Sequence, residues 1–207
     1  MKDIQTFTQT KNFVKYSLKY IKGKVLDLGA GSAKYKQIIK EKSTKYLAFD
    51  MIPGENIDIV GDVLNLPFVN ENFDTVISTQ VLEHISKPWL MVNEIQRVLK
   101  TGGFCILTAP FLIPYHADPH DYFRYTIEGI ESLFKDAGFE ICESGGYGKT
   151  FSVIAEFIRF SWFNPYQKMK KGSWKITHFI TKLAGLLDKF SKNKIIYSNV
   201  YLIARKK

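Results

Sequence analysis

Short runs of β-branched and aromatic residues alternate along this chain with segments whose apolar residues recur at helical spacing. This alternation predicts a parallel sheet with helices packed on it, because parallel strands are joined by long crossovers that are usually helical. Seven segments have strand character: Lys24–Leu28, Tyr46–Asp50, Ile57–Val60, Phe73–Ser78, Phe104–Thr108, Phe139–Glu143 and Ile196–Ala204. We therefore expect an α/β fold with a mainly parallel, seven-stranded sheet and helices on both faces.

The intervening segments carry helix signals. Pro88 suits a first helical turn, and a 3.6-residue apolar period then continues to a stop at the Gly102–Gly103 pair. Thr126 is a candidate N-cap of a later helix, which Gly138 should end. Two further helices are expected, at Asn12–Tyr20 and Ser32–Glu41.

The length of 207 residues suits one domain, residues 1–207, that buries a full core without a disulfide or metal staple. Two cysteines, Cys105 and Cys142, do not make a disulfide framework, and Met1–Lys11 lacks the pattern of a secretory leader. No uncharged apolar run reaches about 18 residues, so a membrane-spanning helix is not expected. The expected compartment is the cytoplasm.

The net charge of +9 is concentrated at one end of the chain. Residues 1–163 hold 18 Lys and Arg against 19 Asp and Glu, whereas residues 164–207 hold 11 against one. Unless it reflects a lysine-rich proteome, this asymmetry indicates an anionic partner for the last segment, a membrane or a nucleic acid.

Residues 145–194 interrupt the alternation with an insertion of about 50 residues where a short connection is usual. Apolar residues at three- and four-residue steps and lysines at every seventh position predict a basic amphipathic helix there. The apolar residues are Trp174, Ile176, Phe179, Ile180, Leu183, Leu187 and Phe190, and the lysines are Lys175, Lys182 and Lys189. We predict that residues 151–194 bind the anionic inner face of the membrane peripherally; alternatively, the helix is a lid, or caps the core with its lysines in water.

The segment from Val25 to Ala33 has the pattern of a strand that enters a glycine turn and opens a helix. Gly29 and Gly31 allow a sharp turn and leave room for a ligand against the backbone. A dinucleotide-binding loop needs a third glycine where this chain has Lys34, and the Asp27 carboxylate would repel a diphosphate. The loop therefore suits a ligand with a cationic centre, and Asp50, at the tip of the second strand, is placed to accept hydrogen bonds from ribose hydroxyls.

Three further segments complete an ordered set: Gly61–Phe68, Gln80–Ile85 and Arg97–Gly103. With the glycine turn, they resemble the class I S-adenosylmethionine-dependent methyltransferases, whose order is D-x-G-x-G, D, L-P-F, L-x-H and R-x-L-K-x-G-G. The resemblance covers residues 24–143 and a final strand. It implies a Rossmann-like sheet with an antiparallel last strand, and S-adenosylmethionine as the cofactor.

The same resemblance implies roles for individual residues. Asp27, Gly29 and Gly31 would face the amino-acid half of the cofactor, Asp50 the ribose, Asp62 and the Val63 amide the adenine, and Gln80 the methionine side, with Met51 as a further contact. The structural alternatives are that Asp62 caps a turn and that Gln80 starts a helix.

A second group of polar side chains lies in Pro114–Thr126, which follows the fifth strand and so belongs to the sheet edge where α/β proteins bind ligands. The segment resembles the H-x-x-P-x-D-Y-x-R-Y-T loop of a methyltransferase subgroup often linked to cell-surface glycan biosynthesis. The predicted catalytic base is His120 or His116, with His84 as a rival, and the predicted substrate contacts are Asp118, Asp121, Tyr122 and Arg124, the last for an anionic part of the acceptor.

Two other interpretations of this segment stay open. His116, Asp118 and His120 could converge on a metal ion, but the sequence offers no distant fourth ligand, so we predict no metal. Alternatively, Asp121 and Arg124 pair within an ordered loop, and His84 is a packing residue.

The implied reaction displaces a methyl group from a sulfonium, so the protein holds donor and acceptor in line and excludes water. A base is needed only where the acceptor loses a proton. The preferred acceptor is a hydroxyl of a sugar or lipid-linked glycan intermediate; a quinone-type small molecule, an RNA and a non-catalytic S-adenosylmethionine-binding module are alternatives. Nucleic acid is disfavoured because the aromatic residues follow helical spacing. The oligomeric state is left open.

Overall fold

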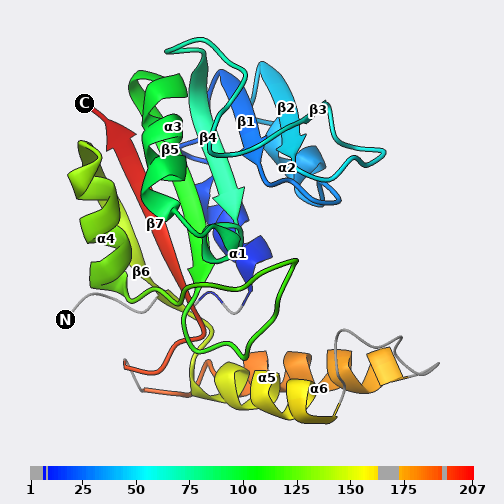
Figure 1. Cartoon of the computed structure of the whole chain (residues 1–207). Helices are drawn as coiled ribbons and strands as arrows, with labels where there is room; N and C mark the ends of the chain where they lie inside the picture. Colours follow the sequence, from blue (N-terminus) through cyan, green and yellow to red (C-terminus); the bar gives the residue numbers. More distant parts are fainter. Residues whose placement is uncertain (1–6, 8, 163–172, 193–194) are drawn as a thin grey trace.

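The computed structural model describes residue 7 and residues 9–162, 173–192 and 195–207. Within these residues, seven strands form one sheet in the order β3-β2-β1-β4-β5-β7-β6 (Figure 1). Their bounds are β1 Lys24–Leu28, β2 Lys45–Asp50, β3 Ile59–Val60, β4 Phe73–Thr79, β5 Leu99–Pro110, β6 Phe139–Tyr147 and β7 Asn199–Lys206. β1 to β5 pair in parallel, and β7 runs antiparallel to both β5 and β6. The predicted fold class, including the antiparallel last strand, is confirmed.

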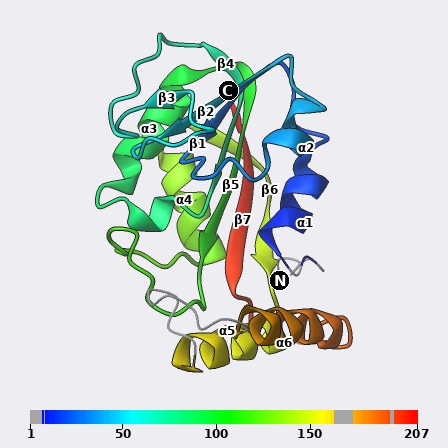
Figure 2. The ribbon, with the colours of Figure 1, turned by 90° about the vertical axis from the view of Figure 1, so that its right-hand side faces the viewer.

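Helices cover both faces of the sheet, with α1 and α2 on one side and α3 and α4 on the other (Figure 2). Because successive strand residues point to opposite faces, β1 contributes Val25 to the layer under α1 and Leu26 to the layer under α3. The helices are α1 Thr10–Ser17, α2 Lys36–Lys40, the 3₁₀ helix η1 Leu82–His84, α3 Pro88–Val98, α4 Ile127–Asp136, α5 Thr150–Trp162 and α6 Ser173–Leu187.

Two helix boundaries follow the sequence signals, and one does not. α3 begins at Pro88, and the Thr126 hydroxyl caps α4 by accepting a 3.0 Å hydrogen bond from the Gly129 amide. However, α3 ends at Val98 rather than at the glycine pair, because Leu99 already pairs with Phe73 as the start of β5. Tertiary strand pairing outweighs the local helical pattern there.

Other boundaries differ from the sequence prediction by several residues. α2 covers only Lys36–Lys40, and residues 31–35 form turns. β7 begins at Asn199 rather than Ile196, because the ring of Tyr197 stacks on Phe111 and Ser198 bonds back to Tyr147 before pairing starts. β6 extends to Tyr147, so the first residues of the predicted 145–194 insertion belong to the sheet.

The rest of that insertion forms a helical hairpin, α5 with α6, beyond the carboxyl edge of the parallel strands (Figures 1 and 2). Asp188 connects the two helices: its carboxylate accepts hydrogen bonds from the Phe151 and Ser152 amides at 2.8 and 3.2 Å. It thereby provides hydrogen-bond acceptors for amide groups in the first turn of α5. A negative charge there also interacts favourably with the positive end of the helix dipole. Among the described residues, no helix has the length and apolarity to cross a membrane. Trp174 and residues 163–172, included in the predicted membrane-binding segment, lie outside the described side chains.

Candidate functional site

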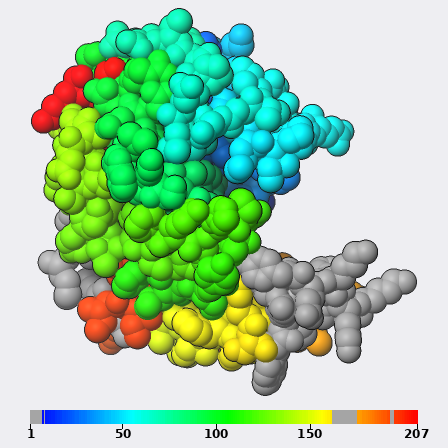
Figure 3. Space-filling view, viewed as in Figure 1, coloured from blue at the N-terminus to red at the C-terminus, as the bar shows by residue number. Residues whose placement is uncertain are grey.

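A cavity of about 880 Å³ opens at the carboxyl edge of the sheet beside β1 and β4, where the strand order reverses. In doubly wound α/β sheets this switch point is the usual ligand site. Figure 3 shows the hollowed face, where the segment between β2 and β3 (cyan) projects above the loop that follows β5 (green). The cavity brings together twelve of the predicted site residues: Asp27, Gly29, Gly31, Asp50, Met51, Asp62, Val63, Gln80, His84, Asp118, His120 and Tyr122. His116, Asp121 and Arg124 do not line it.

The two glycines of the turn after β1 have different surroundings. Both have positive φ, +72° at Gly29 and +55° at Gly31, which disfavours any side chain. A Cβ at Gly29 would lie 2.4 Å from the Val81 side chain, whereas nothing lies within 4 Å of a Cβ at Gly31. Gly29 therefore permits close packing, and Gly31 borders open space in the cavity.

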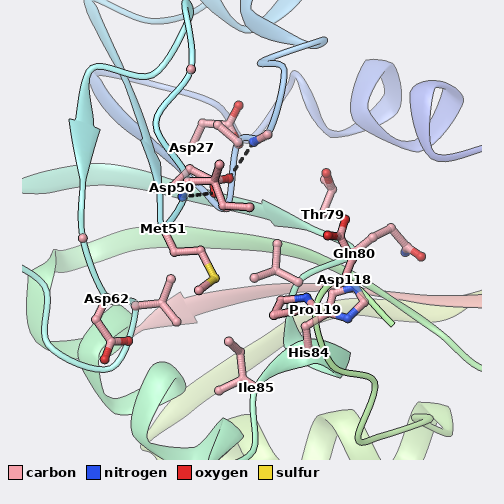
Figure 4. A pocket seen from close by; sticks show the side chains of 18 of the residues that line it. Asp27, Asp50, Met51, Asp62, Thr79, Gln80, His84, Ile85, Asp118 and Pro119 are labelled. Atoms are coloured by element: carbon pink, nitrogen blue, oxygen red, sulfur yellow. Dashed lines mark hydrogen bonds between the residues drawn. The ribbon is translucent and has the colours of Figure 1, made fainter. Parts of the chain in front are cut away.

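Asp50, at the end of β2, holds this turn in place. One carboxylate oxygen accepts a hydrogen bond from the Gly31 amide at 2.8 Å, and the other accepts one from the Ile52 amide at 3.0 Å (Figure 4). Each oxygen has a second acceptor position, so the carboxylate can still bind hydroxyl groups of a ligand. Met51 follows it at the cavity mouth with 59% of its surface exposed.

Asp27 places a buried carboxyl group at the cavity wall. The Tyr46 hydroxyl donates a 2.5 Å hydrogen bond to it. Burial raises the pKa of Asp27 to about 6, against the effect of this hydrogen bond and with a contribution from the Asp50 charge. At neutral pH the group is therefore mostly a carboxylate in a low-dielectric site, which attracts a cationic ligand. No sequence signal pointed to Tyr46.

The remaining predicted cofactor contacts follow along the cavity. The Asp62 carboxylate accepts a 2.8 Å hydrogen bond from the Leu64 amide, so Asp62 does cap a turn. Val63, the residue within this turn, is buried. Gln80 has φ +58°, a strained conformation for a residue other than glycine, and its side-chain amide donates to the Thr108 hydroxyl at 3.1 Å. Such strain is concentrated at functional sites.

The loop between β5 and α4 is held by Arg124. Its five N–H groups all have acceptors: both Asp121 carboxylate oxygens, at 2.5 and 2.6 Å, and the carbonyls of Ile113, Pro114 and Phe123. The Asp121 side chain is buried, which opposes ionisation, but the Arg124 hydrogen bonds and the His116 amide prevail and lower its pKa to about 2. These contacts match the ordered-loop interpretation; binding an anionic acceptor through Arg124 would require some of them to break.

The three histidines of the site occupy different places. His120 is exposed at the cavity, its ring 5.5 Å from that of Tyr122, whereas His84 and His116 face the buried Glu83. Burial disfavours the charged imidazolium of His116, yet Glu83, the Pro114 carbonyl and Asp121 together raise its pKa. In the described part of the chain, His116 therefore gathers with Glu83 and His84, rather than with Asp118 and His120.

Sequence reasoning missed several lining residues, among them Ile52, Thr79 and Ile85. Apolar and hydroxyl residues at strand ends carry no pattern of their own. Glu83 lies in the Leu82-Glu83-His84 segment, but the sequence predicts no role for it, because the pattern does not show that this glutamate is buried.

Comparison with known proteins agrees with this geometry. Residues 26–107 match the model of a methyltransferase domain family. The chain therefore carries a methyltransferase domain within residues 26–107. An uncharacterized methyltransferase of Mycobacterium leprae is 26% identical over 96 residues, a match that covers 41% of this chain and 36% of that protein. The match thus spans little more than a third of such a relative.

Solved structures share the fold over most of the chain. An S-adenosylmethionine-dependent methyltransferase of Archaeoglobus fulgidus aligns with a TM-score of 0.62 at 16% identity, covering 97% of this chain and 96% of that one. Phosphoethanolamine N-methyltransferase 2 of Haemonchus contortus, in complex with S-adenosylmethionine, aligns with a TM-score of 0.63 at 18% identity, covering 95% of this chain and 52% of that one. At these identities the likeness concerns the fold.

Proposed function

We propose that this protein transfers a methyl group from S-adenosylmethionine to a hydroxyl of a lipid-linked glycan intermediate at an anionic membrane surface. The domain family and the cavity at the switch point support methyl transfer. The observation that carries the choice of a lipid-linked acceptor is the apolar outer face of the α5–α6 hairpin.

The residues of the cavity fit the cofactor. S-adenosylmethionine, when bound, supplies a methyl group on a cationic sulfonium, together with an ammonium group and ribose hydroxyls. Asp27 offers a buried negative charge, Asp50 offers carboxylate oxygens, and Gly31 leaves space that a side chain would fill. Each of these features matches one chemical group of this ligand.

The acceptor end of the cavity is formed by the loop after β5. His120, Asp118 and Tyr122 line it, and the exposed ring of His120 is accessible to a substrate. His120 is the proposed base that removes the acceptor hydroxyl proton as the oxygen attacks the methyl group. His120→Ala should lower turnover by about 10² to 10⁴.

The assay would incubate the full chain with S-adenosylmethionine and a lipid extract of the cell envelope, and detect methylated product by mass spectrometry. S-adenosylmethionine affinity should be unchanged in His120→Ala, and the control His178→Ala, on α6, should keep full turnover. A His120→Ala variant as active as the control would remove the base from the proposal, and no methylated product with the wild type would refute the acceptor class.

The hairpin exposes large apolar residues and buries small ones. Val153, Ala155 and Ala184 are buried, whereas the outward residues are 36–78% exposed. These are Phe151, Ile154, Phe157 and Ile158 on α5, and Ile176, Phe179, Leu183, Leu186, Leu187 and Phe190 on and after α6. Such an outward face, accompanied by exposed lysines, is typical of a segment that inserts into a lipid interface.

The position of the hairpin connects this surface with the cavity. Figure 1 shows the loop of residues 111–126 between the carboxyl edge of the sheet and the α5–α6 hairpin. Lys175, Lys182 and Lys189 are exposed on or just after α6, and each lysine near an anionic surface contributes on the order of 1 kcal/mol. A membrane bound at the hairpin would therefore lie on the same side of the molecule as the loop of residues 111–126, which forms the acceptor end of the cavity.

Vesicle co-sedimentation tests this surface with the full chain. Phosphatidylglycerol-containing vesicles should bind the wild type strongly at low salt, and replacement of Ile176, Phe179 and Leu183 by Ser should abolish binding. Val60 and Val69, exposed elsewhere, provide the matched Ser control that should sediment like the wild type. Equal sedimentation of both variants, or none by the wild type, would refute membrane binding.

A further inference from the structure

A buried carboxylate without a hydrogen bond lies behind the acceptor end of the cavity. Glu83, in η1, has no exposed surface, and neither of its carboxylate oxygens has a hydrogen-bond partner among the described residues. Its backbone carbonyl, by contrast, accepts a hydrogen bond from the Tyr122 amide at 2.8 Å. Burying such a group is costly unless something neutralises it.

Ring nitrogens of two histidines lie close to this carboxylate. Nε2 of His84 and Nε2 of His116 each lie 3.7 Å from the same Glu83 oxygen, Oε1. The two rings are edge to face, with centroids 5.3 Å apart. At 3.7 Å, neither nitrogen is within normal hydrogen-bond distance of the carboxylate.

The second nitrogen of each ring fixes which tautomer is present. Nδ1 of His84 lies 2.5 Å from the His120 carbonyl, and Nδ1 of His116 lies 3.0 Å from the Pro114 carbonyl. Because a carbonyl only accepts, each Nδ1 must carry the proton. Arg124 is also 3.3 Å from His116 Nδ1, but the hydrogens of that Nη2 are donated to Asp121 and Pro114. In the neutral rings, both Nε2 atoms therefore present lone pairs to a carboxylate that itself only accepts.

We propose that Glu83, His84 and His116 bind a first-row divalent metal ion, with Zn²⁺ as the reference ion. When both rings are neutral, three electron-pair donors lie within 4.8 Å of one another, with no proton between them. A metal–ligand distance of about 2 Å separates tetrahedral ligands by roughly 3.3 Å, so a small inward movement completes the site. Donation of the outer ring N–H to a backbone carbonyl is the usual second-shell arrangement of metal-binding histidines.

The types of ligand indicate which metal ions would bind, and the location of the ligands indicates from which side the bound ion could be reached. Two imidazoles and one carboxylate suit zinc or iron better than Mg²⁺ or Ca²⁺, which prefer oxygen ligands. Three protein ligands leave a further coordination position for a water or an acceptor oxygen. His84 lines the cavity as well as facing Glu83, so that position would be on the acceptor side. The binding itself does not depend on the proposed methyl transfer.

Calorimetric titration of the chelator-treated full chain with Zn²⁺, without cofactor or acceptor, tests the proposal. We expect one Zn²⁺ per chain, and a loss of affinity of at least about tenfold in both Glu83→Gln and His116→Gln. The matched control is His178→Ala, which removes an exposed histidine far from Glu83 in the sequence and should leave the affinity unchanged.

Two measurements keep this test decisive. Cooperative thermal unfolding and retained S-adenosylhomocysteine binding would show that each variant is folded, and Zn²⁺ should raise the melting temperature of the wild type and of His178→Ala only. The visible spectrum of bound Co²⁺ should disappear in the two ligand variants. Absence of Zn²⁺ binding, or equal binding by Glu83→Gln and His178→Ala, would overturn the proposal and leave a proton on His116 as the counter-charge to Glu83.

Discussion

Tyr46 and Asp27 form a 2.5 Å hydrogen bond, from the tyrosine hydroxyl to the carboxylate, between neighbouring strands β2 and β1. Val25 is the direct partner of Tyr46 in the register, so the ring reaches diagonally to Asp27, the next residue on the same face. The hydrogen bond therefore connects Asp27, which lines the cavity, to the neighbouring strand β2. Burial raises the pKa of both groups.

The raised pKa of Asp27 makes the stability of the fold depend on pH. In the folded state the carboxyl has a pKa of about 6, against 3.8 as the ordinary value. Its protonated form therefore stabilises the fold below pH 4, and that contribution is lost as the pH rises through 6. Asp27→Asn, which stays neutral, should gain on the order of 2 to 3 kcal/mol over the wild type between pH 4 and pH 8.

Urea unfolding at pH 4, 6 and 8 measures this difference. Tyr46→Phe is the matched variant, because removing the hydrogen bond that favours the carboxylate should raise the pKa of Asp27 further and steepen the loss above pH 6. Asp27→Asn should also bind S-adenosylmethionine more weakly at pH 8, despite greater stability. A pH-independent difference between Asp27→Asn and the wild type would contradict the assigned pKa.

Asp50 should contribute to cofactor affinity through both carboxylate oxygens. Asp50→Ala is expected to weaken S-adenosylmethionine binding by about 2 to 4 kcal/mol, since hydrogen bonds to a charged group are lost. Asp50→Asn retains an acceptor for the Gly31 amide and should lose less. Calorimetry would compare both with Glu55→Ala, an exposed acidic residue of the same segment. Unchanged affinity in Asp50→Ala would exclude the ribose role.

The sheet was predictable because its signals are local. β1 has the same bounds in the prediction and in the structure, since Val25, Leu26 and Leu28 are buried in a run that a glycine ends. The helical spacing between Ile95 and Leu99 predicts that Leu99 is a helix residue, and only its pairing with Phe73 places it in a strand. Non-local pairing of this kind leaves no trace in a window of neighbouring residues.

The site was predictable as a group but not in its contacts. Chain order places residues such as Gly31, Asp50 and Gln80 at the ends of strands, and parallel strands bring these ends together. The partners of Arg124 depend on the path of a loop, and three of the residues that accept its hydrogen bonds do so through backbone carbonyls, which every residue has. The burial of Glu83 depends likewise on the packing of that loop over η1.

Gly29 and Gly31 should respond differently to alanine. Both substitutions force a left-handed backbone, which costs roughly 1 to 2 kcal/mol. Gly29→Ala additionally drives its Cβ into Val81, so thermal unfolding should show the larger loss of stability there. Gly31→Ala should mainly reduce S-adenosylmethionine affinity, because its Cβ enters the open space of the cavity. Equal affinity of Gly31→Ala and the wild type would show that the cofactor does not approach this turn.

The Asp121–Arg124 pair should stabilise the acceptor loop far more than an exposed pair does. Asp121 has a pKa of about 2, below the ordinary 3.8, so its contribution is present above pH 4 and is lost as the pH falls through 2. Asp121→Asn should therefore cost about 2 kcal/mol at pH 7, and the difference from the wild type should shrink between pH 4 and pH 2.

Arg124→Ala should cost more, about 3 to 5 kcal/mol, because it leaves the buried Asp121 carboxylate without its cation. The matched control is Arg159→Ala, which breaks an ion pair of the same sequence spacing, between Arg159 and Glu156 on α5. Because this pair is partly exposed, its loss should lower the free energy of unfolding by under about 1 kcal/mol. Urea unfolding would compare the two variants, and calorimetry would measure S-adenosylmethionine binding. Retained cofactor affinity with lost stability would identify Arg124 as the residue that holds the loop. A stable Arg124→Ala variant with lost turnover would instead assign its guanidinium to the acceptor, and the hydrogen bonds it makes within the loop would then have to open when the acceptor binds.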